Sequence, residues 1–153
     1  RRIVPSPEPL SIIELDVIKD IVSRGHVLIS AGGGGIGVIR EDGYLKPSEV
    51  VIDKDLGSAL LAIGLKAKKF IISTSVSNVC LNYKTPEEIN LECVDLQTLK
   101  DYKQKRHFKV GSMLPKIEAA IKFIENTGES VIITSPDRLL EGVKELAGTI
   151  ITK

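Results

Sequence analysis

The sequence has no tryptophan, one methionine and two cysteines, and aromatic residues make up only 4% of its 153 positions. No apolar stretch approaches the roughly 20 residues that a membrane-spanning helix needs, so no membrane segment is predicted. Cys80 and Cys93 form no CxxC pair, and the other soft ligands are His26 and His107. This spacing indicates neither a zinc site nor a disulfide framework. Two free thiols are typical of a reducing compartment, so we expect a cytoplasmic protein.

The sequence also lacks an excess of either charge. It has 21 Lys and Arg residues against 20 Asp and Glu, a formal net charge of +1. Non-specific nucleic-acid binding depends on clustered basic residues, so we expect no nucleic-acid partner. A content of 42% hydrophobic and 27% charged residues is that of an ordinary globular domain. At this length a folded chain buries about 68–70% of the surface that the unfolded chain exposes, which is enough for a core.

The single methionine is Met113, so we expect that Arg1 is not the first residue of a translated chain. We therefore expect the sequence to be a fragment, a processed product or an incomplete record of a longer protein.

Short apolar runs alternate with helical patterns along the chain. A capping box at Ser11–Glu14 and a stop at Gly25 bound the first helical pattern. Strands are predicted at 27–31, 50–52, 70–74, 79–81, 131–134 and 149–151, with another at 38–40 that runs into a turn at 41–43. Helices are predicted at 11–24, 56–65, 95–104 and 113–126, with one more opening at 136–137, and 85–91 is expected to be loop. This alternation favours a three-layer α/β/α fold with a mostly parallel central sheet.

Four consecutive glycines, Gly32 to Gly35, follow the first predicted strand, and Gly37 comes two positions later. Such a run costs backbone entropy, and it indicates a loop whose N–H groups approach an anion without a Cβ in the way. The run also fits the G-x-G-x-x-G pattern of dinucleotide sites, but that pattern must open a helix and here a strand pattern follows. The sequence contains no G-x-x-x-x-G-K-[ST] motif.

Two further junctions place a lysine at the start of a predicted helix. Asp53, Lys54 and Asp55 precede one helix, with Asp53 the expected N-cap, and Lys116 lies in the first turn of another helix behind Ser112. The helix dipole disfavours a cation there, so an anion is expected to compensate it. The neighbouring aspartates alone could do so at the first junction. Two such lysines together with a glycine loop describe a site for a polyphosphate.

The chain resembles the carbamate kinases of the amino-acid kinase family nearly from end to end. The matching motifs are Arg2 to Pro7, Gly32 to Ile36, Val51 to Asp55, Asn82-Tyr83, His107-Phe108 and Gly111 to Ala120. The resemblance implies the amino-acid kinase fold and reversible phosphoryl transfer between ATP and carbamate, with Mg²⁺ bound through the nucleotide phosphates. In fermenting organisms this reaction ends the arginine deiminase pathway and makes ATP from ADP and carbamoyl phosphate.

The resemblance also implies roles for individual residues. Lys54 and Lys116 would contact the phosphates, and Asp55 would hold both lysines in place. Gly33 and Gly34 would face the carbamoyl group, with Asp53 beside them. The nucleotide-binding residues would be Lys54, Thr74, Tyr83, Met113, Pro115 and Lys116. Taken without the resemblance, Tyr83 would be interpreted as a loop tyrosine and Met113 as a filler of the core.

The chain departs from the family pattern in three places. Gly37 stands where the family usually has proline, which predicts a less rigid loop. The stretch around Ser75 lacks an acidic residue that is common in the wider family, which bears on nucleotide affinity, and Lys84-Thr85 replaces a Gly-Lys pair.

Carbamate kinases are about twice as long as this chain, and the resemblance is confined to their C-terminal half. Residues 1–50 would be the end of the substrate lobe and 51–153 the nucleotide lobe, and the absent N-terminal half would bring another lysine and the main interface of a homodimer. Two alternatives remain open, a nucleotide-binding module without catalysis and a family member that phosphorylates another small acid.

Overall fold

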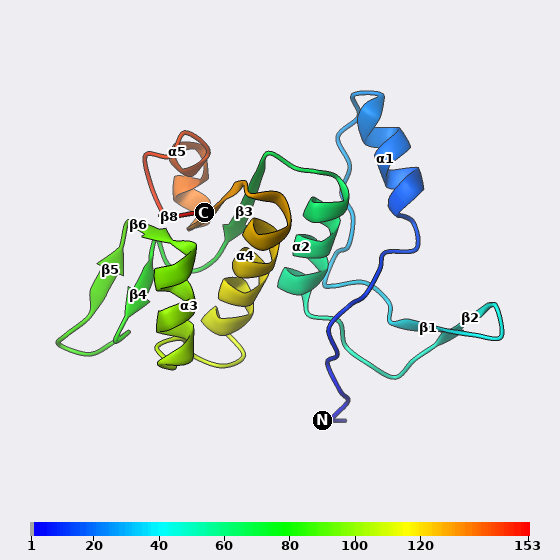
Figure 1. The fold of residues 1–153 in the computed structure, drawn as a ribbon, viewed down its shortest axis with the longest axis horizontal. Helices are drawn as coiled ribbons and strands as arrows, with labels where there is room; N and C mark the ends of the chain where they lie inside the picture. Colours follow the sequence, from blue (N-terminus) through cyan, green and yellow to red (C-terminus); the bar gives the residue numbers. More distant parts are fainter. Residues whose placement is uncertain (1) are drawn as a thin grey trace. The chain divides into compact units, whose positions relative to one another are not determined.

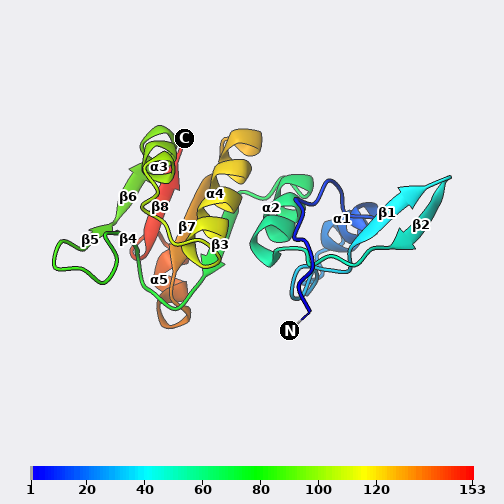
Figure 2. The same cartoon turned by 90° about the horizontal axis from the view of Figure 1, so that it is seen from below.

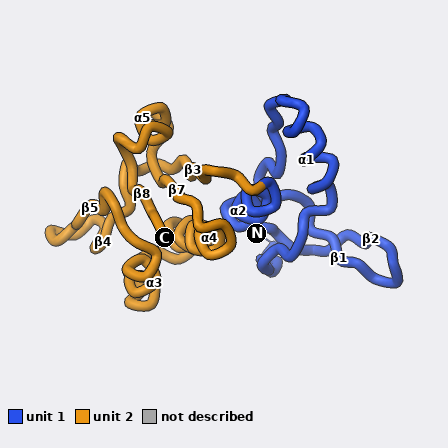
Figure 3. The backbone as a smooth tube through the Cα atoms, turned by 45° about the horizontal axis from the view of Figure 1, so that its top comes forward, with its two compact units in different colours: residues 1–65 blue, residues 66–153 orange. Residues whose placement is uncertain are grey.

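The computed structural model describes residues 2–153, and the chain divides into two compact units. The first unit ends at Leu65 and the second comprises Lys66–Lys153 (Figure 3). The division lies fifteen residues beyond the lobe boundary expected at residue 50. Which unit binds which substrate stays a prediction.

The first unit holds helix α1 (Leu15–Ser23), a hairpin of β1 (Val38–Glu41) and β2 (Tyr44–Pro47), and helix α2 (Lys54–Gly64) (Figure 1). The hairpin turns at Asp42 and Gly43, which both have positive φ, as an Asp-Gly turn requires. The strand predicted at 38–40 is therefore confirmed and is extended by an antiparallel partner.

Three predictions in this unit are wrong. Residues 27–31 and 50–52 are not strands, because no strand among residues 2–153 pairs with them, and a strand exists only through inter-strand hydrogen bonds. Val27 and Ile29 are 96% and 97% exposed, so their apolar pattern is not matched by burial here. The capping box at Ser11 does not form either: α1 begins at Leu15 with Glu14 at its N-cap position.

The second unit is built on a four-stranded sheet of order β3-β7-β8-β6. The strands are β3 (Lys69–Ser73), β7 (Ser130–Thr134), β8 (Thr149–Thr152) and β6 (Cys93–Asp95). The pairs β3/β7 and β6/β8 are parallel, while β7 and β8 run antiparallel. A small antiparallel hairpin of β4 (Val79–Leu81) and β5 (Ile89–Leu91) belongs to the same unit.

Helices cover both faces of this sheet. Helices α3 (Leu96–Gln104) and α4 (Met113–Thr127) lie on one face, and the short helices η1 (Pro136–Arg138) and α5 (Leu139–Val143) lie on the other (Figures 1 and 2). The apolar side of α4 is buried against the sheet, with Ile117 and Phe123 fully covered. The helix ends at Gly128, whose left-handed backbone is the usual C-terminal stop. The predicted three-layer α/β/α architecture with a mostly parallel sheet is confirmed, and the antiparallel pair of β7 and β8 makes the sheet mixed.

Two local predictions in the second unit need correction. The expected loop at 85–91 ends in strand β5, because Ile89 to Leu91 find hydrogen-bond partners in β4. Strand β6 was not expected, since its three residues directly precede a strong helix pattern. Asp95 separates the two elements by capping α3, accepting hydrogen bonds from the backbone N–H and the hydroxyl of Thr98.

Candidate active site

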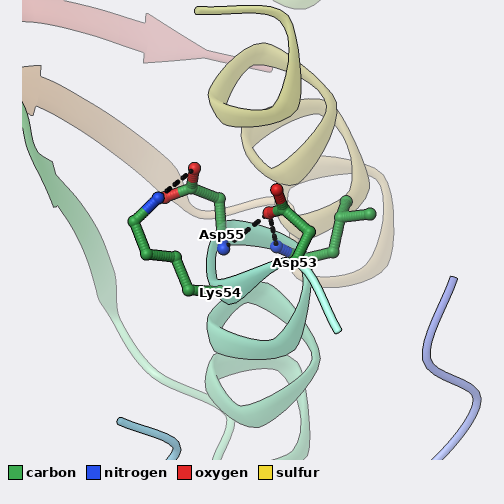
Figure 4. A network of polar contacts seen from close by, with 4 residues as sticks. Asp53, Lys54 and Asp55 are labelled. Carbon is green, nitrogen blue, oxygen red and sulfur yellow. Dashed lines mark hydrogen bonds and ion pairs between the residues drawn. The ribbon is translucent and has the colours of Figure 1, made fainter. Parts of the chain in front are cut away.

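Asp53 builds the start of α2. Its Oδ1 accepts hydrogen bonds from the backbone N–H groups of Asp55 and Leu56, at 2.8 and 3.2 Å (Figure 4). This is the N-cap that the sequence predicts, and it places Lys54 as the first helical residue. The cap therefore fixes the backbone from which the Lys54 and Asp55 side chains project.

Lys54 and Asp55 form an ion pair, with Lys54 Nζ 3.2 Å from Asp55 Oδ2 (Figure 4). The Asp55 side chain is 9% exposed and that of Lys54 is 57% exposed. A buried carboxylate at a helix N-terminus is favoured by the dipole, and it offsets the unfavourable position of the lysine. The arrangement holds an ammonium group at the surface, where it can contact an anion.

The glycine run lies against the segment that leads into α2. Gly34 has a φ of +130°, and a Cβ built on it would stand 2.0 Å from the carbonyl oxygen of Ile52 and 3.3 Å from the N of Lys54. No other residue type fits at Gly34, because any side chain would collide with this backbone. At Gly33 a built Cβ meets nothing within 4 Å, so that position is open. The structure therefore brings Gly33 and Gly34 together with Asp53, Lys54 and Asp55.

Lys116 lies in the first turns of α4 in the second unit and is 9% exposed. The first turn of α4 carries no acidic residue, and the N-cap residue Ser112 makes no side-chain capping bond. Met113 and Pro115 are half-buried in the same turn. The structure therefore places Met113, Pro115 and Lys116 together at this helix start, with no acidic side chain in its first turn.

Thr74 directly follows β3, and its N–H donates to the carbonyl of Thr134 at 2.8 Å. It therefore lies at the carboxyl ends of two parallel strands, where ligands gather in α/β sheets. Tyr83 is 48% exposed in the loop after β4, with Lys84 Nζ 5.4 Å from its ring centroid. Its exposed ring is available for stacking.

The sequence did not predict a pair of hydroxyl groups at the same edge of the sheet. Ser77 Oγ and Ser135 Oγ are 3.3 Å apart, and Ser135 is buried. The Ser135 side chain also hydrogen-bonds the Asp137 carboxylate, and this bond is the main cause that lowers the pKa of Asp137. The signal was present in the sequence, because Ser135 follows a buried strand directly.

The predicted site residues thus fall into two groups. The first unit holds Gly33, Gly34, Asp53, Lys54 and Asp55, and the second holds Thr74, Tyr83, Met113, Pro115 and Lys116. Across residues 2–153, no group of three or more His, Cys, Asp or Glu side chains is placed to hold a metal ion. The same part of the chain has no helix long and apolar enough to cross a bilayer.

A glycine run, a capped lysine junction and a second lysine at a helix start are all features on which the sequence resemblance rests. The family model described as "Amino acid kinase family" matches residues 1–135. This chain belongs to the amino acid kinase family.

Within the amino acid kinase family, the chain is similar to carbamate kinases. It is 46% identical to the carbamate kinase of Thermococcus kodakarensis over 153 residues, which are the whole of this chain and 49% of that protein. It is 48% identical over 155 residues to "Carbamate kinase 1" of Staphylococcus epidermidis, covering 100% of this chain and 50% of the relative. The chain therefore spans about half the length of the curated relatives it matches.

Solved structures of carbamate kinases are also similar to this chain. The structure titled "Carbamate kinase from Giardia lamblia bound to AMP-PNP" superimposes with a TM-score of 0.97 at 41% identity, covering 99% of this chain and 48% of that chain. The predicted resemblance to carbamate kinases and the fold that it implies are thus confirmed.

Proposed function

We propose that this chain supplies the C-terminal half of a carbamate kinase, which transfers a phosphoryl group reversibly between ATP and carbamate. Three findings support the proposal: similarity to carbamate kinases over the whole chain, relatives about twice as long, and a relative solved with an ATP analogue. The observation that carries it is the packing of Gly34 against the Asp53-capped start of α2, with Lys54 as its first residue.

In the direction of ATP synthesis, a terminal oxygen of ADP attacks the phosphorus of carbamoyl phosphate. The bond between that phosphorus and the carbamoyl oxygen breaks, and carbamate leaves with its electron pair. Such a transfer needs positioning and charge stabilisation rather than covalent catalysis by the protein. Positively charged residues near the transferred group therefore make the largest contribution to catalysis.

Lys54 and Lys116 would supply this charge. Asp55 holds Lys54 in place through the 3.2 Å ion pair, and the resemblance to carbamate kinases implies the same role toward Lys116. The open backbone at Gly33 and the neighbouring Gly34 would face the carbamoyl group. Asp53 would act by positioning, because its Oδ1 is already engaged in capping α2.

Thr74, Tyr83, Met113 and Pro115 would bind the nucleotide. The first lies at the sheet edge and the others present a ring and apolar atoms suited to a base. Mg²⁺ would be held by the nucleotide phosphates, where it would neutralise their charge. We further propose cytoplasmic location, a homodimer as the full-length protein and a place at the end of arginine fermentation, as the resemblance implies. The two free cysteines agree with a reducing compartment.

The test uses a full-length protein, meaning this sequence extended before Arg1 to the length of its relatives. ATP formation from ADP and carbamoyl phosphate is followed with a coupled assay. We expect Lys116→Ala to lower kcat by about 10²–10³-fold, the usual effect of removing one group that stabilises developing charge. Lys122→Ala, on the same helix, is the matched control and should keep wild-type activity.

Two other results would point elsewhere. If the full-length protein makes no ATP but ADP still raises its melting temperature, the chain is a nucleotide-binding module without catalysis. If it transfers phosphate only to another acceptor in a panel of small acids, the fold assignment stands and the substrate is different.

A further inference from the structure

The glycine run is held at two points by the segment 48–52. Gly34 packs on the carbonyl of Ile52, as described above, and three residues further on the Gly37 carbonyl accepts a hydrogen bond of 3.0 Å from the Ser48 N–H. The segment is itself anchored, because the Val51 N–H donates to the carbonyl of Pro5 at 3.0 Å. The glycine run and the residues that lead into α2 therefore lie side by side.

Val50 fills the space beside Gly37. A Cβ built on Gly37 would stand only 2.2 Å from Val50 Cγ2, which is far inside any real carbon–carbon contact. The methyl group of Val50 thus occupies the volume that a side chain at position 37 would take. The sequence alone predicts a less rigid loop at Gly37, but the contact with Val50 restricts the movement of this loop.

We propose that Val50 is a positioning residue for the phosphoryl transfer: by packing on Gly37 it fixes the end of the glycine run relative to Lys54. Val50 precedes Lys54 by four residues in a segment whose Ile52 also contacts Gly34. A displacement of this segment would therefore move the open backbone at Gly33 and the lysine apart. The activity part of this inference rests on the proposed function, while the packing part does not.

The geometry allows a test that moves a methyl group from one residue to the other. In Val50→Ala the Cγ2 atom is gone, and a Cβ at position 37 would then lie 3.7 Å from the Cβ of residue 50 and 3.8 Å from Ile52 Cδ1. These are ordinary van der Waals distances. Gly37→Ala alone must displace Val50, Val50→Ala alone leaves a gap, and the double variant refills the gap.

The three variants are compared in the full-length protein, with Val51→Ala as the matched control because the neighbouring Val51 side chain is 56% exposed. We expect each single variant to lower kcat by about tenfold, since an ångström-scale misplacement can cost about 10²-fold. The KM for ADP should stay within about twofold of wild type. The double variant should recover to within about threefold of wild-type kcat. Amide hydrogen exchange at residues 33–37 should quicken in Val50→Ala and slow again in the double variant.

Two results would overturn the inference: unchanged kcat and unchanged exchange in Val50→Ala, or a double variant whose losses are the product of the single losses. If the wild-type protein makes no ATP, the proposed function fails by itself. In that case the exchange at residues 33–37 still decides whether Val50 holds the glycine run.

Discussion

Replacing Thr149 by valine removes a hydroxyl group that joins the small β4/β5 hairpin to the main sheet. Thr149 is fully buried at the start of β8, and its Oγ1 accepts a hydrogen bond of 2.8 Å from the Val79 N–H while donating to the Leu91 carbonyl. Thr134, on the neighbouring strand β7, is equally buried, but its Oγ1 has no hydrogen-bond partner in the described part of the chain. The same substitution should therefore destabilise the protein at Thr149 and not at Thr134.

The magnitudes follow from the partners that each change leaves behind. Valine at 149 leaves the Val79 N–H buried without an acceptor, which costs about 1–3 kcal/mol, and loses one further hydrogen bond worth about 1 kcal/mol. The Leu91 carbonyl keeps a second donor, Asn78 Nδ2 at 3.1 Å, so it adds no penalty. We expect Thr149→Val to destabilise the protein by about 3 kcal/mol in total. Thr134→Val removes a buried hydroxyl that makes no hydrogen bond in the described part of the chain. The free energy of unfolding of this variant should therefore be unchanged or higher by about 1 kcal/mol.

Urea unfolding followed by circular dichroism measures both free energies, and amide exchange at Val79 reports the local effect. The exchange of Val79 should quicken more in Thr149→Val than in Thr134→Val. The reasoning is refuted if the two variants have equal stability, or if Thr134→Val is the more destabilised of the two.

Two further predictions concern titratable groups. Hydrogen bonds from the hydroxyl and N–H of Thr98 lower the pKa of Asp95. The stability that Asp95 contributes as a cap is therefore fully present above the pKa of the unfolded state, and it is lost as the pH falls through the pKa of the folded state. The gap in melting temperature between wild type and Asp95→Asn should therefore shrink on acidification below about pH 4, and a gap that widens would contradict this. Burial, with a smaller effect of Glu88, raises the pKa of Cys80, whereas Cys93 is exposed. Iodoacetamide at neutral pH should alkylate Cys93 well before Cys80, as peptide mass spectrometry would show, and equal labelling would be inconsistent with this order.

The sequence predicted well those features that depend on local chemistry. The Asp53 cap and the strand at 131–134 were predicted correctly, because capping residues and dense apolar runs act over a few residues, whereas the helix predicted at 56–65 begins at Lys54. The sequence predicted the glycine run as a loop whose N–H groups approach an anion, and this stays a prediction, whereas the close approach of Gly34 to the Ile52 carbonyl was not predicted.

Features that depend on distant partners were not predictable. Residues 27–31 have the composition of a buried strand, yet they form neither helix nor strand, and no strand among residues 2–153 pairs with them. Conversely, Ile89 to Leu91 have little strand pattern and become β5 through pairing with β4. The contact of Val50 with Gly37 shows the same limit within the site, since nothing in the local sequence indicates that a valine methyl replaces a side chain thirteen positions earlier.

The order of strands in the second unit also affects how that unit folds during synthesis. Among the strands described here, β8 comes last in sequence but occupies an inner position, between β7 and β6. A chain that stops before Thr149 would leave β6 without its sheet neighbour and the buried edge of β7 open to solvent. During synthesis, this edge stays exposed until β8 emerges, a period in which unpaired strands are prone to associate wrongly. Loss of β8 should therefore split this sheet rather than shorten it.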